Sequence, residues 1–227
     1  MKFKILLFFI GLIGPVFQAS AAGQITVTGQ GSVEAVPDMA TISLGVTTQA
    51  KTAAEALKVN SETTAAILEQ VATAGILPRD VITSGLSLSP NWLTNTSDGS
   101  SAIVGFIANN QVTIRVRDLP SLGMILDEVV RNGANTFNGL MFGLQDPAPK
   151  MDEARRRAVE DAIRKAELYA AAASVALGPI SDLTENGGML PVPMFRQSDM
   201  MMEASVPVAE GEISIAASVT VVFEIAD

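Results

Sequence analysis

The stretch from Lys150 to Leu177, KMDEARRRAVEDAIRKAELYAAAASVAL, carries the clearest structural pattern in the chain. Alanine recurs at every fourth position, at 154, 158, 162, 166 and 170, which predicts a long helix with one smooth face. Such a helix can lie close to a sheet or to another helix, because no bulky side chain holds the two apart. Its other side carries four acidic–basic pairs at i,i+4, which stabilise a helix modestly: Asp152/Arg156, Glu153/Arg157, Glu160/Arg164 and Asp161/Lys165.

The segments around this helix alternate between strand and helix patterns. A capping box at Thr52 and Glu55 opens a helix over residues 52–75, and a second helix is predicted over residues 118–133. Residues 103–107 and 111–116 form either one long bent strand or a hairpin, and residues 90–101 are predicted to form an exposed loop. The remaining predicted strands are 25–29, 41–46, 81–89, 135–145, 180–184 and 213–225.

The order of these elements predicts the fold class. Strand–helix–strand occurs twice and is followed by helix–strand–strand. We therefore expect an α+β protein in which about three helices pack on a mixed, mainly antiparallel sheet. Strands that alternate in polarity bury one face only, which argues against a doubly wound parallel sheet.

The N-terminal residues predict export. Lys2 and Lys4 precede an apolar run over residues 5–17, and small residues follow at Ala19-Ser20-Ala21. This run is about 13 residues long, whereas a membrane-spanning helix needs roughly 20. We expect residues 1–22 to be a signal peptide cleaved at Ala21 or Ala22, with a retained anchor as the alternative. The mature protein would then be periplasmic, with no stable membrane insertion.

The composition excludes several kinds of chemistry. The chain has no cysteine and no histidine, so disulfides, thiolate nucleophiles, imidazole bases and Cys/His zinc sites cannot form. The formal net charge is −9, which argues against nucleic acid and anionic membrane surfaces as partners. No catalytic motif stands out, and we expect neither enzymatic activity nor a cofactor.

A few isolated features of the sequence are candidate sites. The run 155–157 consists of three arginines and could bind an anion, but acidic residues one turn away favour a solvated, ion-paired helix face. Gly29-x-Gly31 follows a strand, but no helix pattern comes after it, so a turn is favoured over a phosphate loop. Three carboxylates could act as bases, although nothing in the sequence pairs them: Asp38, Asp80 and Asp127.

The segment 187–211 is unusual because prolines interrupt it and half of the ten methionines of the chain lie in it. A loop that packs adaptively on a neighbour or partner subunit is the favoured interpretation. A Cu(I) site is the sharper alternative, because thioethers are soft ligands. Sacrificial oxidation of the thioethers is a third interpretation. The candidate ligands are Met189, Met194, Met200, Met201 and Met202.

Several motifs together resemble the SIMPL-domain family of bacterial exported proteins. They are Ile25–Ser32 with Pro37–Ala40, Gly75-Ile76, Asp80–Ser84, Leu88–Pro90, Gly105–Asn110, Arg117–Leu119, Leu126-Asp127, Gly133–Asn135, the 152–167 helix and Gly211–Ile213. The likeness covers essentially the whole mature chain, and only Trp92 and Phe106 depart from it, where the family often shows tyrosine. Those two departures put in doubt only a hydroxyl contact at each place.

The resemblance implies one SIMPL domain over residues 23–227, with an exposed Pro/Met-rich loop at 187–211. It also implies a periplasmic α+β protein without known enzymatic activity. Some members resemble builders of ring-like homo-oligomers, and others are linked to defence against oxidative stress. Two hypotheses follow. The first is a non-catalytic, homo-oligomeric assembly or stress-protection protein, and the second is a periplasmic Cu(I)- or ligand-binding module that uses the methionine loop.

Overall fold

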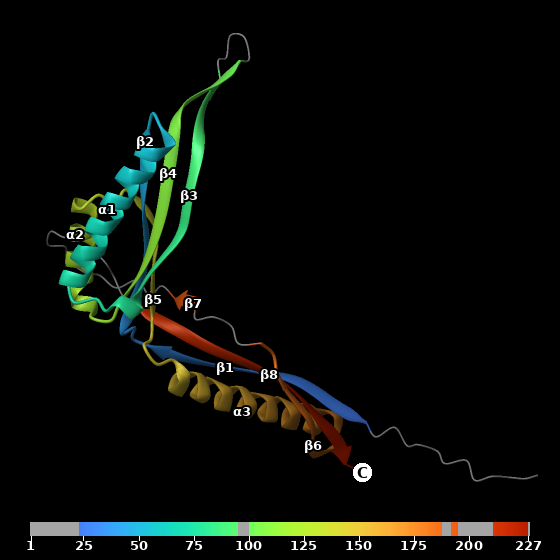
Figure 1. Ribbon diagram of the computed structural model, residues 1–227. Coiled ribbons are helices and arrows are strands. Elements are labelled where there is room, and N and C mark those ends of the chain that lie inside the picture. Colours follow the sequence, from blue (N-terminus) through green and yellow to red (C-terminus); the bar gives the residue numbers. More distant parts are fainter. Residues whose placement is uncertain (1–22, 95–99, 188–191, 195–210, 227) are drawn as a thin grey trace, which may run out of the picture.

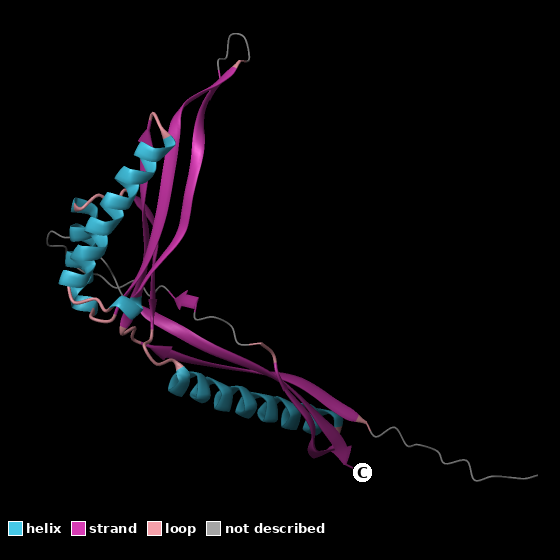
Figure 2. Cartoon of the chain, in the orientation of Figure 1, coloured by secondary structure: helices cyan, strands magenta, loops and turns pink. Residues whose placement is uncertain are grey.

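The strands form two separate antiparallel sheets, and each sheet carries helices on one face only (Figures 1 and 2). The computed structural model describes residues 23–94, 100–187, 192–194 and 211–226. The α+β class with mainly antiparallel strands and three helices is confirmed. The strands are divided between two sheets, however, where a single sheet was expected.

The first sheet has the strand order β3-β4-β2-β5, and two α-helices cover it. Its long central strand β4 shows that the segments 103–107 and 111–116 belong to one strand. The strands are β2 (Met39–Ala50), β3 (Val81–Thr94), β4 (Ser101–Val116) and β5 (Thr136–Gly143). The helices are α1 (Ala53–Thr73) and α2 (Leu122–Arg131), with short 3-10 turns η1 (Pro78–Asp80) and η2 (Leu119–Ser121).

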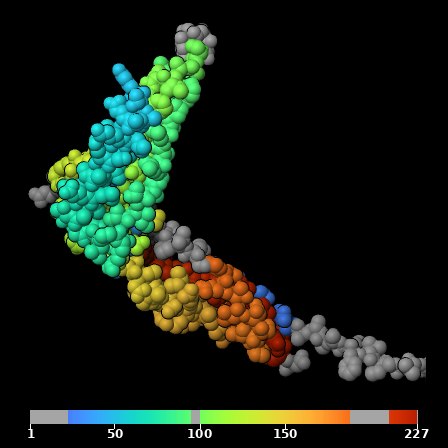
Figure 3. Space-filling view, in the orientation of Figure 1, coloured from blue at the N-terminus to red at the C-terminus, as the bar shows by residue number. Residues whose placement is uncertain are grey.

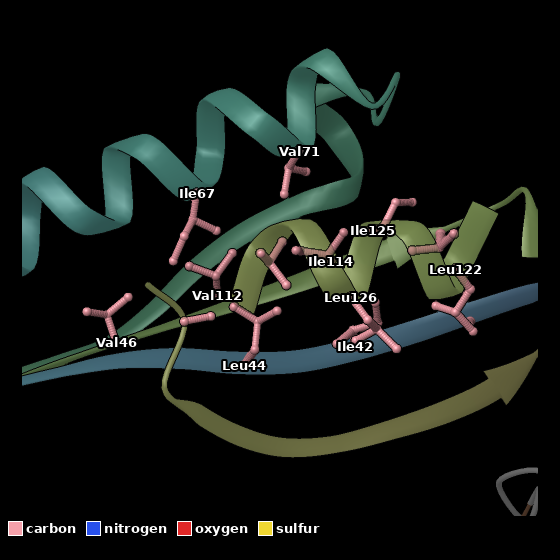
Figure 4. Close-up of a cluster of buried hydrophobic side chains, with 14 of the residues drawn as sticks. Ile42, Leu44, Val46, Ile67, Val71, Val112, Ile114, Leu122, Ile125 and Leu126 are labelled. Atoms are coloured by element: carbon pink, nitrogen blue, oxygen red, sulfur yellow. The ribbon is translucent and has the colours of Figure 1, made fainter. Parts of the chain in front are cut away.

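The core of this first unit lies between the sheet and its two helices (Figure 4). Alternate residues of β2 and β4 point into it because successive strand side chains face opposite sides. Helices α1 and α2 contribute residues at helical spacing. Fully buried members include Ile42, Leu44, Val46, Ile67, Val71, Val112, Ile114 and Ile125.

The second sheet pairs the two ends of the described chain. Strand β1 (Gln24–Ala35) lies antiparallel to β8 (Glu212–Ala226), with Gln24 opposite Glu224 and Ala35 opposite Ile213. On the other side of β8 lie β6 (Ala176–Glu185) and the short β7 (Val192–Met194). Helix α3 (Ala148–Ala173) covers this sheet.

The alanine stripe of α3 is buried as predicted, at 154, 158, 162, 166 and 170. It packs on β1 at Gly29 and Gly31. A Cβ atom at Gly29 would lie 2.0 Å from the carbonyl oxygen of Ala158, and one at Gly31 would lie 2.2 Å from that of Ala154. The turn predicted for Gly29-x-Gly31 is therefore wrong: both glycines lie inside a strand, where they let helix backbone and sheet backbone approach closely.

Two element boundaries differ from the prediction. Helix α3 ends at Ala173 instead of residue 177, because Ser174 adopts a left-handed conformation with φ of 56° and closes the helix. Strand β3 continues to Thr94, through half of the segment predicted as a loop. Pro90 is tolerated there because β3 is an edge strand of its sheet.

The two units meet at an angle, with the helices outside and both helix-free sheet faces toward the inside (Figures 2 and 3). The chain passes between them twice, at residues 36–38 and 144–147, since β1 precedes the first sheet and α3 follows it. The amide of Asp38 donates to the carbonyl oxygen of Gly143 at 3.1 Å, so the two crossings lie side by side.

Candidate functional site

A two-stranded ribbon projects from the first sheet (Figure 1). Strand β2 ends at Ala50, opposite Phe106, but β3 and β4 continue pairing as far as Thr94 and Ser101. Residues 91–94 and 101–105, here called the projecting ribbon, therefore have no third strand beside them among the residues that the structure describes. Isolated two-stranded ribbons are marginally stable in water, so contact with another surface would stabilise this one.

Large apolar side chains are exposed on both faces of the ribbon. Trp92 and Leu93 are 57% and 63% exposed, and Ile103 and Val104 are 50% and 48% exposed. Consecutive strand residues point to opposite sides, so each pair supplies both faces. Further down β3, exposed apolar residues continue at Ile82, Leu86 and Leu88. Contiguous exposed apolar surface on a folded protein typically marks an interaction site.

The ribbon is also free of charge. Strand β3 contains no ionisable side chain, and neither do residues 101–114 of β4. The whole chain carries a formal net charge of −9. Two copies of such an acidic protein repel each other over most of their surfaces, and a neutral apolar segment is where they can meet without placing like charges together.

The free edge of β1 in the second sheet, unlike the projecting ribbon, is covered by side chains of α3. Three charged side chains of α3 cover its backbone groups: Asp161 accepts from the amide of Gln30 at 3.0 Å, and Arg157 and Lys165 donate to the carbonyl oxygens of Ser32 and Thr28, each at 2.8 Å. Hydrogen bonds from Lys165 and from the Gln30 amide hold the pKa of Asp161 well below its usual range. A covered edge cannot pair with a foreign strand.

A buried ion pair lies near the junction of the two units. The side chain of Asp80 is only 2% exposed, and Arg117 donates to both of its oxygens, from Nε at 2.8 Å and from Nη2 at 2.7 Å. The hydrogen bond from Arg117 lowers the pKa of Asp80. Arg79 and Arg115 lie 3.9 Å from the same carboxylate. Asp80 is thus held as a paired anion, which makes it a poor proton acceptor.

Gln145 connects this ion pair to both chain crossings. Its Oε1 accepts from Arg117 at 3.3 Å, its backbone amide donates to Oδ1 of Asp38 at 2.7 Å, and its Nε2 donates to the Asp38 carbonyl oxygen at 3.0 Å. The structure therefore links Asp38 with Asp80 through Arg117 and Gln145. Asp127, on α2, takes part in no hydrogen bond or ion pair with this cluster in the described part of the chain.

Sequence reasoning missed Arg117 and Gln145 as members of this cluster. Arg117 and Asp80 are far apart in sequence, and no local spacing relates them. The signals present in the sequence are Arg117-Asp118 and Asp80-Val81, which belong to the motifs that carry the family resemblance. The cluster orients two crossings of the chain, which is a positioning role.

The three arginines at 155–157 are paired and do not form an anion site. Arg155 binds Asp152 and Glu185, each at 3.0 Å, and Arg157 binds Glu153 at 3.1 Å. Arg156 also binds Glu153. Of the four predicted i,i+4 pairs, Glu153/Arg157 and Asp161/Lys165 form, while Arg156 and Arg164 pair at i,i+3 instead.

The predicted signal cleavage positions and most of the methionine candidates lie outside the described residues. These are Ala21, Ala22, Met189, Met200, Met201 and Met202. The backbone of Met194 belongs to β7, where it pairs with Glu212. Of the helices that the structure describes, none combines the length and the apolar character needed to cross a bilayer.

The fold and its surface define a two-sheet α+β protein with an exposed apolar ribbon. The chain belongs to the SIMPL family, described as proteins of unknown function (DUF541), whose family model matches residues 25–223. The family resemblance inferred from the sequence motifs is thereby confirmed.

Two relatives show how far the similarity extends. The chain is 40% identical over 211 residues to the 26 kDa periplasmic immunogenic protein of Brucella melitensis, covering 89% of this chain and 84% of the relative. It is 30% identical over 218 residues to the uncharacterized protein YggE of Escherichia coli K12, covering 93% and 87%. Neither name states an enzymatic reaction, and the first places that relative in the periplasm.

Proposed function

We propose that this protein is exported to the periplasm and works there, without catalysis, as a homo-oligomeric assembly. The observation that carries the proposal is the projecting ribbon, which is apolar on both faces and free of charge. Charged side chains of α3 cover the β1 edge, so association by the β3–β4 side is favoured over association at that edge.

The oligomeric mass of the mature protein tests this proposal. Light scattering after size-exclusion chromatography should give a multiple of the monomer mass for the wild type. The triple variant Trp92→Ser, Leu93→Ser, Ile103→Ser should give a smaller mass, because the apolar contact is lost while the exposed positions leave the fold intact.

A matched control uses equally exposed apolar residues elsewhere. Leu168 and Tyr169 on α3 are 59% and 54% exposed. The variant Leu168→Ser, Tyr169→Ser should keep the wild-type mass. A monomeric wild type, or a control that dissociates as readily as the ribbon variant, would contradict the proposed surface.

Export is the second part of the proposal. It is supported by the N-terminal pattern of residues 1–22 and by the name of the Brucella relative, which is a periplasmic protein. N-terminal sequencing of protein from the periplasmic fraction should give Ala22 or Gly23 as the first residue. An intact Met1 in the membrane fraction would show that the segment is retained as an anchor.

The alternative function is a periplasmic soft-metal module, favoured by the five methionines within 187–211. Replacing Met189, Met194, Met200, Met201 and Met202 with leucine keeps most of the volume and removes the sulfur. We expect the variant to retain the wild-type oligomeric mass, and the wild type to bind Cu(I) only weakly. A tight Cu(I) complex that disappears in the variant would support the metal module instead.

A contribution to oxidative-stress defence is a further part of the proposal, and the same variant tests whether it is direct. Thioether oxidation would consume oxidant at these methionines. If cells carrying the all-leucine variant lose peroxide resistance without any copper effect, the methionines act as sacrificial oxidant sinks. We expect resistance to be unchanged.

A further inference from the structure

The helix-free face of the first sheet carries a polar hollow of about 150 Å³. It spans all four strands, with Gly45 from β2, Gly85 from β3, Asn109 and Gln111 from β4, and Thr136 and Asn138 from β5. Here it is called the amide hollow. The face that bears it lies away from α1 and α2, on the inner side of the angle (Figure 2).

Glycine and two β-bulges create the hollow. Gly45 lies in register between Gln111 and Thr136, so the sheet has no side chain at this point. In β3, Gly85 and Leu86 together lie opposite the single residue Asn110, so the strand has one extra residue here, and Gly85 has φ of 67°. In β5 the extra residue is Asn138, between two residues paired with β2. Bulges commonly re-aim side chains beside binding sites.

Hydrogen bonds fix the orientation of the side-chain amides of Asn109 and Gln111 on β4. The hydroxyl of Thr47 donates to Oδ1 of Asn109 at 2.5 Å, and Nε2 of Gln111 donates to the hydroxyl of Ser43 at 2.7 Å. The Nδ2 group of Asn109 and the Oε1 atom of Gln111 have no further partner in the described part of the chain. The Oε1 atom borders the hollow, because a Cβ at Gly85 would lie 3.3 Å from it.

Hydrogen bonds also hold the β5 side of the hollow in place. Asn135 accepts from the amide of Thr47 and donates to its carbonyl oxygen, each at 2.8 Å, and the hydroxyls of Thr47 and Thr136 are 3.0 Å apart. Two motifs that the proposed assembly leaves unexplained, Asn109-Asn110 and Gly133–Asn135, are thus joined across β2 by one threonine. A preorganised set of amides and hydroxyls lowers the entropic cost of binding.

The chemistry of the lining selects the ligand. No residue that lines the amide hollow is ionisable, so neither an anion nor a cation finds a counter-charge there. Two residues apart on one strand, Asn109 and Gln111 offer a donor and an acceptor about 7 Å from each other. A hydroxyl group both donates and accepts. A hollow of about 150 Å³ is large enough for several waters or one small ring.

We propose that the amide hollow binds a neutral polyhydroxylated ligand, a carbohydrate. A peptide fits this site less well, since the backbone groups of β2 and β4 are used within the sheet and a peptide strand would add at an edge. The inference is independent of the assembly proposed above, because the ribbon residues and the lining residues are different.

Saturation-transfer difference NMR on the intact mature protein tests the proposal, since the method tolerates large assemblies. Glucose and N-acetylglucosamine serve as neutral probes, with glucose 6-phosphate and N-acetylglycine amide as comparators. At least one neutral sugar should give a saturable signal. The double variant Asn109→Leu, Gln111→Leu should weaken its binding about tenfold or more, because two hydrogen-bonding groups are lost.

The matched control is Gln24→Leu, which replaces an exposed amide of the second sheet and should leave sugar binding unchanged. If the double variant fails to fold, Asn138→Ala replaces it, since this side chain makes no hydrogen bond with the described residues. Absence of a saturable sugar signal, undiminished binding by the variants, or a preference for the phosphorylated or amide comparator would overturn the carbohydrate assignment.

Discussion

Asp80 forms the buried ion pair that lies near the junction of the two units. Its carboxylate is buried, receives two hydrogen bonds from Arg117 and has two more arginines nearby. An arrangement of this kind is stabilising only while both partners are charged and in place, because a buried group without its partner is costly. The side chain of Arg117 remains 35% exposed, so water screens part of the interaction.

Replacing Asp80 with asparagine should lower the free energy of unfolding at pH 7 by about 1–3 kcal/mol, toward the low end for buried pairs because of this screening. Chemical denaturation measures the change. Asp127→Asn is the control, since Asp127 lies on α2 and forms no ion pair within the described residues. An equal effect from both variants would show that the ion pair contributes nothing specific.

Stability should also fall in acid. The pKa of Asp80, of Asp161 and of Glu153 is lowered, in each case first by a hydrogen bond from a basic side chain. A carboxyl group whose pKa is lower when folded stabilises the protein above its unfolded pKa, and this contribution is lost as protons bind below about pH 4. Denaturation midpoints should therefore drop from pH 5 to pH 3, and less steeply in Asp80→Asn. A midpoint that rises on acidification would contradict this sign.

A buried amide offers a second test at the residue scale. Asn60 is fully buried, and its Nδ2 donates to the carbonyl oxygens of Val46 at 2.7 Å and Ala108 at 3.1 Å. Asn60→Ala should cost about 2–3 kcal/mol, because both carbonyl groups lose a donor in an apolar core. Thermal or urea unfolding measures it, with Glu62→Ala on the exposed side of α1 as the control. A change below 1 kcal/mol would imply that the carbonyl groups find other donors.

At the scale of elements, α3 and β1 lie very close together, because alanines meet glycines across the contact. The helix depends on this smooth face for its position over the sheet. Its opposite face carries exposed ion pairs, each of which is worth little. The two faces should therefore respond very differently to substitution.

Ala162→Leu should destabilise the protein by about 1–3 kcal/mol through overpacking. Arg156→Ala should leave the denaturation midpoint almost unchanged, because its guanidinium is on the exposed side of the helix. Chemical denaturation of both variants under one set of conditions gives the comparison. Equal small effects would show that the alanine face tolerates bulk.

The elements themselves were largely predictable because side-chain periodicity is local. The three helices and most strands follow from apolar spacing and from caps such as Thr52, whose hydroxyl accepts from the Glu55 amide. The end of β3 was not predicted, because Pro90 and the polar residues after it have the composition of a loop. Gly29 and Gly31 were misassigned because a close helix contact leaves the same sequence signature as a turn.

The division into two sheets and the composition of the sites could not be predicted in this way. Alternation identifies a strand but does not name its partner, so the pairing of β1 with β8 is invisible along the sequence. The Asp80–Arg117 pair and the amide hollow likewise join residues from separate strands. The exclusion of cysteine and histidine chemistry needs no structure, because it depends on residue types alone.

At the scale of the whole molecule, the first unit is inserted between the strands of the second. Met39 pairs with Gly143, so the ends of the inserted segment are neighbours in one sheet. Residues 39–143 contain the complete first core. We expect this fragment to fold alone, with a cooperative unfolding transition and dispersed amide NMR signals. A fragment with the spectrum of an unfolded chain would show that the first unit depends on α3 and β8.

The pairing of β1 with β8 has a consequence for the order of events during folding. Strand β1 is synthesised early, but its partner β8 lies at the other end of the chain, with Gln24 opposite Glu224. The two strands can therefore pair only when nearly the whole chain has been synthesised. Contacts this distant in sequence form slowly, whereas the inserted unit closes over shorter loops. Pulse-labelling hydrogen exchange should accordingly show protection of residues 39–143 first and of β1 last. Until then β1 stays an unprotected strand, open to proteases and chaperones while the rest of the molecule is already folded.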